Sequence, residues 1–133
     1  MNHDYDRITY YKADLREIEA KLKEALSKIR QVKLAIIFGS ITRRSNIRDV
    51  DIGVYIEPPI DLKYLLRLAC KLEDLLGLPV DLVPLNEAPP SLVLKALQKG
   101  IIVKDDSKIR TELIYRALSE KLDVEMKSYQ LKR

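Results

Sequence analysis

Two short apolar runs on either side of a polar, arginine-rich stretch constrain the fold more than any other part of the chain. The first, Leu34–Phe38, is too short and too β-branched for a helix and ends at Gly39, so it predicts a strand. The second, Val50–Ile56, has the same character and ends before Pro58, because proline cannot continue a strand ladder. We expect the connection, residues 40–48, to be a loop or the first turn of a short helix.

The other segments alternate between helical and extended patterns. Apolar residues spaced by three and four predict an N-terminal helix over about 5–31 and further helices over Leu62–Leu76 and Ser91–Lys99. Two more short strands are expected at Val80–Val83 and Ile101–Val103. The last helix, over about 107–128, is expected to turn one set of apolar residues inward: Ile109, Leu113, Ala117, Leu122 and Met126.

This order of elements, α-β-β-α-β-α-β-α, predicts an α+β or mixed α/β fold with a small mixed sheet of about four strands. The 133 residues suit one domain over 1–133, with a core over 32–106 between the two terminal helices. No apolar run approaches the ~20 residues of a membrane span, and the N-terminus lacks the pattern of a signal peptide. The expected location is the cytoplasm. Cys70, the single cysteine, is expected to pack as a small apolar side chain.

Acidic residues mark the candidate site. Asp49 and Asp51 are two positions apart, so on a strand they face the same side, roughly 6–7 Å apart along the backbone. Asp81 lies within an apolar strand, where a charge is costly without a metal or a cationic partner; the alternative is a strand-edge aspartate facing solvent. Gly39 and Ser40 would let a phosphate approach the main chain. The combination predicts metal-dependent phosphoryl or nucleotidyl transfer.

The same residues resemble a known family. Phe38-Gly39-Ser40-x-x-Arg43, then Asp49-x-Asp51 and the strand around Asp81, look like the DNA polymerase β-type nucleotidyltransferases, and most closely their minimal nucleotidyltransferase (MNT) subfamily. The resemblance covers about residues 32–125. Two features depart from the family pattern. Eight residues separate Ser40 from Asp49 where the family usually has about ten, and Arg44 stands where glycine is common.

The resemblance implies roles for the residues that bind the nucleotide. Gly39 and Ser40 would contact the triphosphate of ATP. Arg43, Arg44 or Arg48 would add cationic contacts to the phosphates, with structural salt bridges as the alternative for each. The net charge of +4 would suit a phosphate-bearing partner, but we interpret it as a mixed-sign, heavily charged surface.

It also implies a metal centre and a reaction. Asp49 and Asp51 would hold two Mg²⁺ ions, and Asp81 would be the third carboxylate, which helps to deprotonate the acceptor hydroxyl. The chain would then be an enzyme, a nucleotidyltransferase whose acceptor attacks the α-phosphate of a nucleoside triphosphate and displaces pyrophosphate.

Members of the MNT subfamily are typically paired with a small helical HEPN ribonuclease. The implied function is that of an antitoxin, a protein adenylyltransferase that moves AMP from ATP to a tyrosine of its HEPN toxin. Two alternatives stay open: a non-catalytic protein of the same fold that blocks its partner sterically, and a transferase acting on a small molecule. A homo-oligomer is also possible, because the apolar stripe of the N-terminal helix can cover either the sheet or a second subunit.

Overall fold

The computed structural model describes residues 9–59 and 61–131, so the first predicted residues of the N-terminal helix, 5–8, lie outside the described part. The helical elements are α1 (Leu15–Ser27), the 3₁₀ turn η2 (Gly39–Thr42), α2 (Leu62–Leu76), α3 (Pro90–Lys99) and α4 (Ser107–Leu131). The strands are β1 (Tyr11–Lys12), β2 (Val32–Phe38), β3 (Asn46–Ile47), β4 (Val50–Ile56), β5 (Val80–Pro84) and β6 (Ile101–Lys104).

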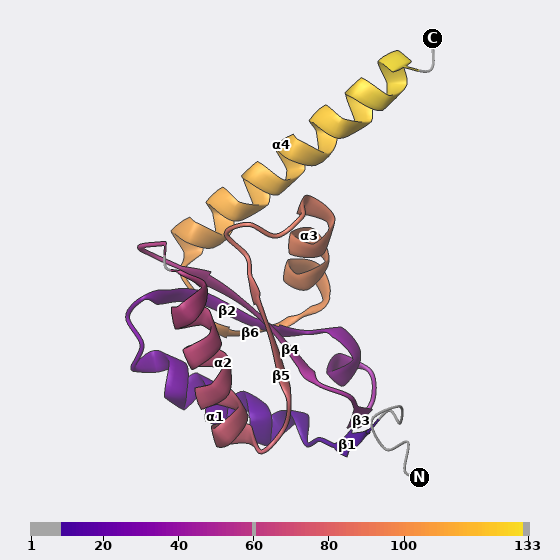
Figure 1. Cartoon of the computed structure of the whole chain (residues 1–133). Coiled ribbons are helices and arrows are strands. Elements are labelled where there is room, and N and C mark those ends of the chain that lie inside the picture. Colours follow the sequence, from indigo (N-terminus) through magenta and orange to yellow (C-terminus); the bar gives the residue numbers. More distant parts are fainter. Residues whose placement is uncertain (1–8, 60, 132–133) are drawn as a thin grey trace.

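Four of these strands form a mixed sheet in the order β5-β4-β2-β6, which confirms the predicted fold class (Figure 1). β2 is antiparallel to both of its neighbours, whereas β4 and β5 are parallel and are connected through α2. A separate two-stranded ribbon joins β1 to β3. Because β2 ends where β4 and β5 begin, the Gly39 corner and the aspartates of the sequence analysis meet at one end of the sheet.

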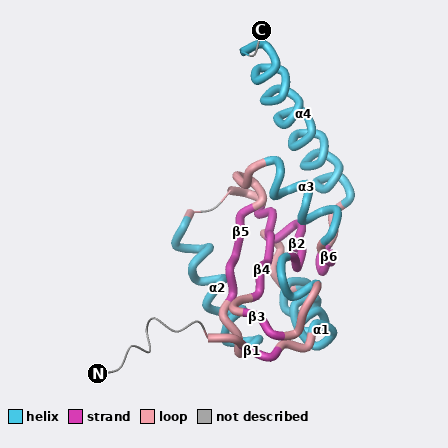
Figure 2. The backbone as a smooth tube through the Cα atoms, turned by 90° about the vertical axis from the view of Figure 1, so that its right-hand side faces the viewer, coloured by secondary structure: helices cyan, strands magenta, loops and turns pink. Residues whose placement is uncertain are grey.

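Helices cover both faces of the sheet (Figure 2). Side chains alternate between the faces of a strand, so Ala35 and Ile37 of β2 pack toward α1 and α2. Leu34 and Ile36 pack toward α3 and α4 on the other face. The central strand is therefore apolar at almost every position, as expected for a strand that is buried on both sides.

The N-terminal helix is shorter than the apolar spacing predicts. Asp14 caps its start, since the carboxylate accepts hydrogen bonds from the backbone N–H groups of Arg16 and Glu17 at 3.1 and 3.3 Å. Tyr11, which also fits the helical spacing, instead pairs with Ile47 across the β1–β3 ribbon. The predicted start near residue 5 and end near 31 were therefore wrong for the described residues.

The C-terminal helix corrects a second expectation. Ile109, Leu113 and Ala117 are buried as predicted, but Leu122 and Met126 are each 55% exposed. α4 projects away from the body of the domain beyond this buried part (Figure 1). Arg116 ties its middle to the loop after β5 by donating hydrogen bonds to the carbonyl oxygens of two loop residues, Leu85 and Asn86, at 3.4 and 3.1 Å.

Two further expectations concern Cys70 and membrane-spanning helices. Cys70 is exposed on α2, so the expectation that it packs as an apolar side chain was wrong. None of the helices within residues 9–59 and 61–131 is long and apolar enough to cross a membrane.

Candidate active site

Strand pairing brings the three predicted aspartates together. In the β2–β4 pair Phe38 lies opposite Asp51, and in the β4–β5 pair Asp51 lies opposite Asp81. Asp49 precedes β4 by one residue. Because all of these positions are at the same end of the sheet, residues 30 positions apart in the sequence, such as Asp51 and Asp81, meet at one place.

The side chains of the three aspartates converge. One carboxylate oxygen from each of Asp49, Asp51 and Asp81 lies within 4.8 Å of the other two. Asp49 and Asp51 are partly buried, while Asp81 is exposed. Asp81 is therefore both a member of the acidic cluster and a residue that faces solvent, although the sequence offered these two descriptions as alternatives. Hard carboxylate oxygens at this separation fit a divalent cation such as Mg²⁺.

The electrostatics of Asp51 reflect this crowding. Burial, followed by the charges of Asp49 and Asp81 and a side-chain hydrogen bond with Asp81, raises the pKa of Asp51 from 3.8 to about 6. The unliganded site therefore disfavours the ionised state of its central carboxylate. A bound cation would reverse this effect, since it attracts all three carboxylates at once.

Replacing Asp51 with asparagine should make the metal-free protein more stable near pH 7.5. Because folding raises the pKa of this acid, the folded protein loses stability as the pH rises from 3.8 to about 6, and the full loss is present above that range. After allowance for solvent screening, the variant should gain about 1–2 kcal/mol, or roughly 3–6 °C in Tm. Thermal melts in EDTA at two pH values check this: the gain should vanish near pH 4.

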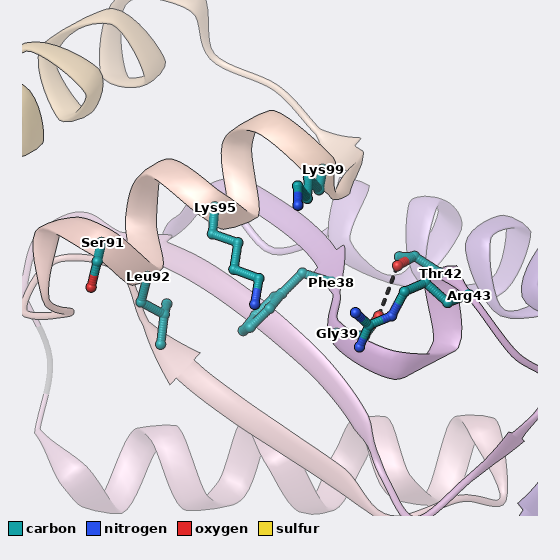
Figure 3. Close-up of a pocket in the computed structure, with 8 residues that line it drawn as sticks. All are labelled: Phe38, Gly39, Thr42, Arg43, Ser91, Leu92, Lys95 and Lys99. Atoms are coloured by element: carbon teal, nitrogen blue, oxygen red, sulfur yellow. Dashed lines mark hydrogen bonds between the residues drawn. The ribbon is translucent and has the colours of Figure 1, made fainter.

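Gly39 forms the corner that faces Asp51. Its φ is +82°, in the left-handed region that favours glycine. A Cβ at this position would overlap the Asp51 carboxylate, with the Asp51 Cγ only 3.0 Å away. The hydroxyl of Thr42 donates a hydrogen bond to the Gly39 carbonyl oxygen at 2.7 Å and closes the turn (Figure 3). The backbone can therefore approach the acidic cluster only because residue 39 has no side chain.

A cavity of about 680 Å³ opens beside this corner, between the end of β2 and the side of α3 that carries Leu92 and Lys95. Figure 3 shows the side chain of Lys95 extending from α3 toward the ring of Phe38, with the Arg43 guanidinium close to Gly39. Lys99, one helical turn beyond Lys95, lines the same cavity. The cavity thus combines an aromatic ring with several cationic groups, a combination that suits a nucleotide.

Sequence reasoning missed Lys95 and Lys99. The signal that could have found them is their spacing of four residues, which places both on one face of the helix over Ser91–Lys99. A pair of lysines on an amphipathic helix is most often a solvated face, so the pattern alone did not distinguish a site. Only the packing of α3 against β2 turns this pair toward the glycine corner.

The other predicted binding residues line a second cavity, of about 470 Å³, on the side of η2 and β3. Ser40, Arg44 and Arg48 lie there with Asp49. The predicted arginines are therefore divided, with Arg43 in the first cavity and the other two here. Among the described residues, none of the three arginines forms an ion pair within 4.0 Å, so the alternative of structural salt bridges finds no support there.

A groove of about 590 Å³ lies on the opposite side of the acidic cluster, between β5 and α2. Asp81 lines it together with apolar residues of α2, notably Leu62, Leu65 and Leu66. Leu62 and Leu66 are mostly exposed. The acidic cluster therefore stands between a cationic cavity on the Gly39 side and an apolar groove on the Asp81 side.

Comparison with known proteins agrees with this geometry. Several solved structures share the fold. A toxin–antitoxin structure with AMP-PNP is 24% identical with a TM-score of 0.71, and the match covers 85% of this chain and 94% of that one. A tri-AMPylated Shewanella oneidensis HEPN toxin in complex with an MNT antitoxin gives 22% identity and a TM-score of 0.70, covering 89% of this chain and 95% of the other.

A third structure, provisionally described as a minimal nucleotidyltransferase, is 31% identical with a TM-score of 0.56 and covers 67% of this chain and 95% of its own. No curated protein matches the chain significantly. The family model described as "Polymerase beta, Nucleotidyltransferase" matches residues 20–109, a span that includes the glycine corner and all three aspartates. The chain therefore belongs to the polymerase β nucleotidyltransferase family.

Proposed function

We propose that this chain is a Mg²⁺-dependent protein adenylyltransferase that transfers AMP from ATP to a tyrosine hydroxyl of a cognate HEPN toxin, and thereby acts as its antitoxin. The observation that carries the proposal is the meeting of three carboxylates beside a side-chain-free corner and a cationic cavity. The antitoxin role is supported by the likeness to MNT antitoxin complexes, one of which contains an AMPylated HEPN toxin.

Asp49, Asp51 and Asp81 are the residues that would hold the metal ions. Bound Mg²⁺ supplies positive charge that neutralises the phosphates and favours displacement at phosphorus. The chain itself supplies converging oxygen donors within 4.8 Å of one another. Two ions are expected from the family resemblance, and these three carboxylates would hold them.

The nucleotide would occupy the cavity beside Gly39. Its phosphates would lie toward the glycine corner, where the main chain is accessible, and Arg43 and Lys95 would contribute positive charge. Phe38 would offer a flat apolar surface to the base. The non-hydrolysable ATP analogue in a structure of the same fold supports nucleotide binding by this architecture.

The acceptor would approach from the Asp81 side. Its hydroxyl oxygen forms a bond to the α-phosphorus, the bond from that phosphorus to the bridging oxygen breaks, and pyrophosphate leaves. The hydroxyl proton passes to the Asp81 carboxylate, which is exposed at the edge of the cluster and faces the apolar groove. Leu65 and Leu66 of that groove would contact the segment that carries the tyrosine.

The direct test uses ATP labelled at the α-phosphate. The purified chain, Mg²⁺ and the HEPN protein encoded beside it are incubated together, and both proteins are resolved by electrophoresis and mass spectrometry. Label should appear on the HEPN protein as AMP on a tyrosine, and EDTA should prevent it. An unlabelled HEPN protein, in a reaction where nucleotide binding to the chain is verified, would refute the proposed activity.

The steric alternative has one observation in its favour. The long Arg44 side chain shares the second cavity with Ser40 and Asp49. The loop between these two residues is also shorter than is usual in the family. If the protein neutralises its partner only by covering it, the double variant Asp49→Ala/Asp51→Ala should protect cells from the toxin as well as the wild type does. We expect protection to be lost, although the two proteins still bind each other.

Replacing Lys95 with alanine should weaken nucleotide binding. Its ammonium group faces the cavity, and a hydrogen bond to a charged group is worth about 1.5–3 kcal/mol, so the KM for ATP should rise roughly 10–100-fold with a smaller change in kcat. The matched control is Lys28→Ala, which removes an exposed lysine from the end of α1 on the other face of the sheet. Equal KM values for the two variants would remove Lys95 from the site.

A further inference from the structure

The groove between β5 and α2 carries acidic residues at both of its ends. At one end lies Asp81, which also belongs to the acidic cluster. At the other end Asp61 immediately precedes α2 and Glu87 follows β5, and both residues are exposed. None of the described residues that line the groove is a lysine or an arginine. Although the chain has 24 lysines and arginines, this groove therefore presents negative charge alone.

The two walls of the groove have nearly the same length. Because only residues 77–79 connect α2 to β5, the two elements run in opposite directions, and the start of α2 lies beside the end of β5 (Figure 2). The helix rises about 10 Å from Leu62 to Ala69. The strand rises roughly 10 Å from Asp81 to Pro84. The acid at the catalytic end is thus separated from the far acids by the whole length of these walls.

Apolar side chains lie between the two acidic ends. Leu62 and Leu66 form the outer rim of the groove and are 69% and 58% exposed. Leu65 and Leu82 line it at greater depth and are partly buried. Since β5 is the edge strand of the sheet, no further strand within the described chain covers this side. The groove therefore combines an apolar middle with acidic ends.

Hydrogen bonds hold the far end of the groove in place. The Asn86 side chain accepts a hydrogen bond from the Ile56 N–H at 3.0 Å and donates one to the Ile56 carbonyl oxygen at 2.9 Å. Arg116 of α4 donates a hydrogen bond to the Asn86 carbonyl oxygen at 3.1 Å. Asp61 caps α2 by accepting a hydrogen bond from the Tyr64 N–H at 3.0 Å. The backbone that carries the far acids is thus ordered in advance, which lowers the cost of binding.

We propose that this groove binds the acceptor segment of the partner protein, with the tyrosine at Asp81, an apolar stretch against α2, and a lysine or arginine at Asp61 and Glu87. The inference rests on the proposed transferase function and adds the feature by which the acceptor is selected. Two observations support it. The groove reaches the acidic cluster through Asp81, and within residues 9–59 and 61–131 none of its three acids forms an ion pair.

The length of the groove defines the acceptor further. A cation at the far end would lie at least about 10 Å from the tyrosine hydroxyl, which corresponds to roughly two turns of a helix or three residues of an extended segment. A negative charge at that place in the acceptor would face Asp61 and Glu87 and would be repelled. The preferred acceptor is therefore a basic, partly apolar segment, and an acidic segment is disfavoured.

The first test removes the charge at the far end and keeps its shape. Asp61→Asn retains a side chain that caps helices well, and Glu87→Gln has the same size as the original. AMP transfer is measured with the HEPN protein encoded beside the chain as the varied acceptor. In the double variant the KM for this acceptor should rise roughly 5–20-fold at low salt, while kcat and the KM for ATP stay unchanged. The difference should shrink at about 0.5 M salt, where charges are strongly screened.

The matched control is Asp74→Asn/Glu125→Gln, which neutralises two exposed acids outside the groove. It should behave like the wild type. An unchanged KM for the acceptor in the groove variant, or an equal rise in the control, would overturn the inference and leave the transferase function standing. A rise in the KM for ATP would assign the far acids to the nucleotide and would overturn it as well.

A binding measurement separates this inference from the proposed activity. In a calorimetric titration without ATP, the HEPN protein should bind the wild-type chain, and its dissociation constant should rise by the same 5–20-fold factor in the groove variant. This result would support the groove even if no AMP were transferred. A wild-type chain that does not bind the HEPN protein would overturn the inference.

A charge exchange identifies the pairing. Lysines and arginines of the HEPN protein are replaced singly by glutamate, and each product is titrated into the wild-type chain and into Glu87→Lys. One replacement should weaken binding to the wild type and restore binding to Glu87→Lys, because the two opposite charges have changed places. If no replacement is compensated in this way, Glu87 does not pair with a cation of the acceptor and the inference fails.

Discussion

Replacing Asp51 with asparagine should abolish measurable nucleotidyl transfer, with a fall in kcat of about 10³-fold or more. Asp51 lies close to the other two carboxylates and directly beside the Gly39 corner. Removal of its negative charge therefore weakens the binding of a cation that all three carboxylates would share. The removal of several kcal/mol of charge stabilisation in the transition state corresponds to a loss of this size. Single-turnover transfer of labelled AMP measures it.

The control for this prediction is Asp74→Asn, which removes an exposed carboxylate from α2 without touching the cluster. It should keep the full rate. The same Asp51→Asn protein should melt at a higher temperature than the wild type in EDTA, so a misfolded variant cannot explain the lost activity. Transfer at more than a tenth of the wild-type rate would show that Asp51 is not part of the reaction centre.

Replacing Gly39 with alanine should also inactivate the protein and should cost about 1–3 kcal/mol of folding free energy. The residue has a φ of +82°, and the added methyl group would collide with the Asp51 carboxylate. Relief of that collision requires Asp51 to turn away from Asp49 and Asp81. Chemical unfolding measures the loss of stability, and the transfer assay measures the loss of activity.

Gly77 offers a matched comparison, because its φ is +67° but nothing lies within 4 Å of a Cβ built there. Gly77→Ala should therefore cost about 1 kcal/mol through backbone strain and leave transfer unchanged. If the two alanine variants lose the same stability and both retain activity, the close approach of the Gly39 backbone to the carboxylates has no functional role.

Local patterns in the sequence predicted most of the fold. The bounds of the strand Val50–Ile56 and of the helix Leu62–Leu76 were predicted to the residue, because Pro58 and Pro59 separate the two elements and Gly77 follows the helix. The start of α1 could not be predicted in the same way. Tyr11 fits the helical spacing, but its pairing with Ile47 is a long-range contact that no local pattern contains. The tertiary contact overrode the local preference.

At the end of α4, the apolar spacing predicted a contact that the described residues do not make. Leu122 and Met126 continue the apolar spacing and were predicted to be buried, but the described part of the domain does not cover them beyond Ala117. Periodicity indicates that one side of a helix is apolar and says nothing about what covers it.

Among the candidate site residues, Lys95 was missed because only the packing of α3 places it beside the glycine corner, whereas Asp81 stood out as an acid within an apolar strand.

The most direct test of the cation site is a calorimetric titration of Mg²⁺ into the protein with a non-hydrolysable ATP analogue present. The wild type should give a saturable binding heat, which Asp51→Asn should lose while Asp74→Asn retains it. An identical isotherm for the wild type and Asp51→Asn would contradict the account, because the metal would then bind elsewhere than among these carboxylates.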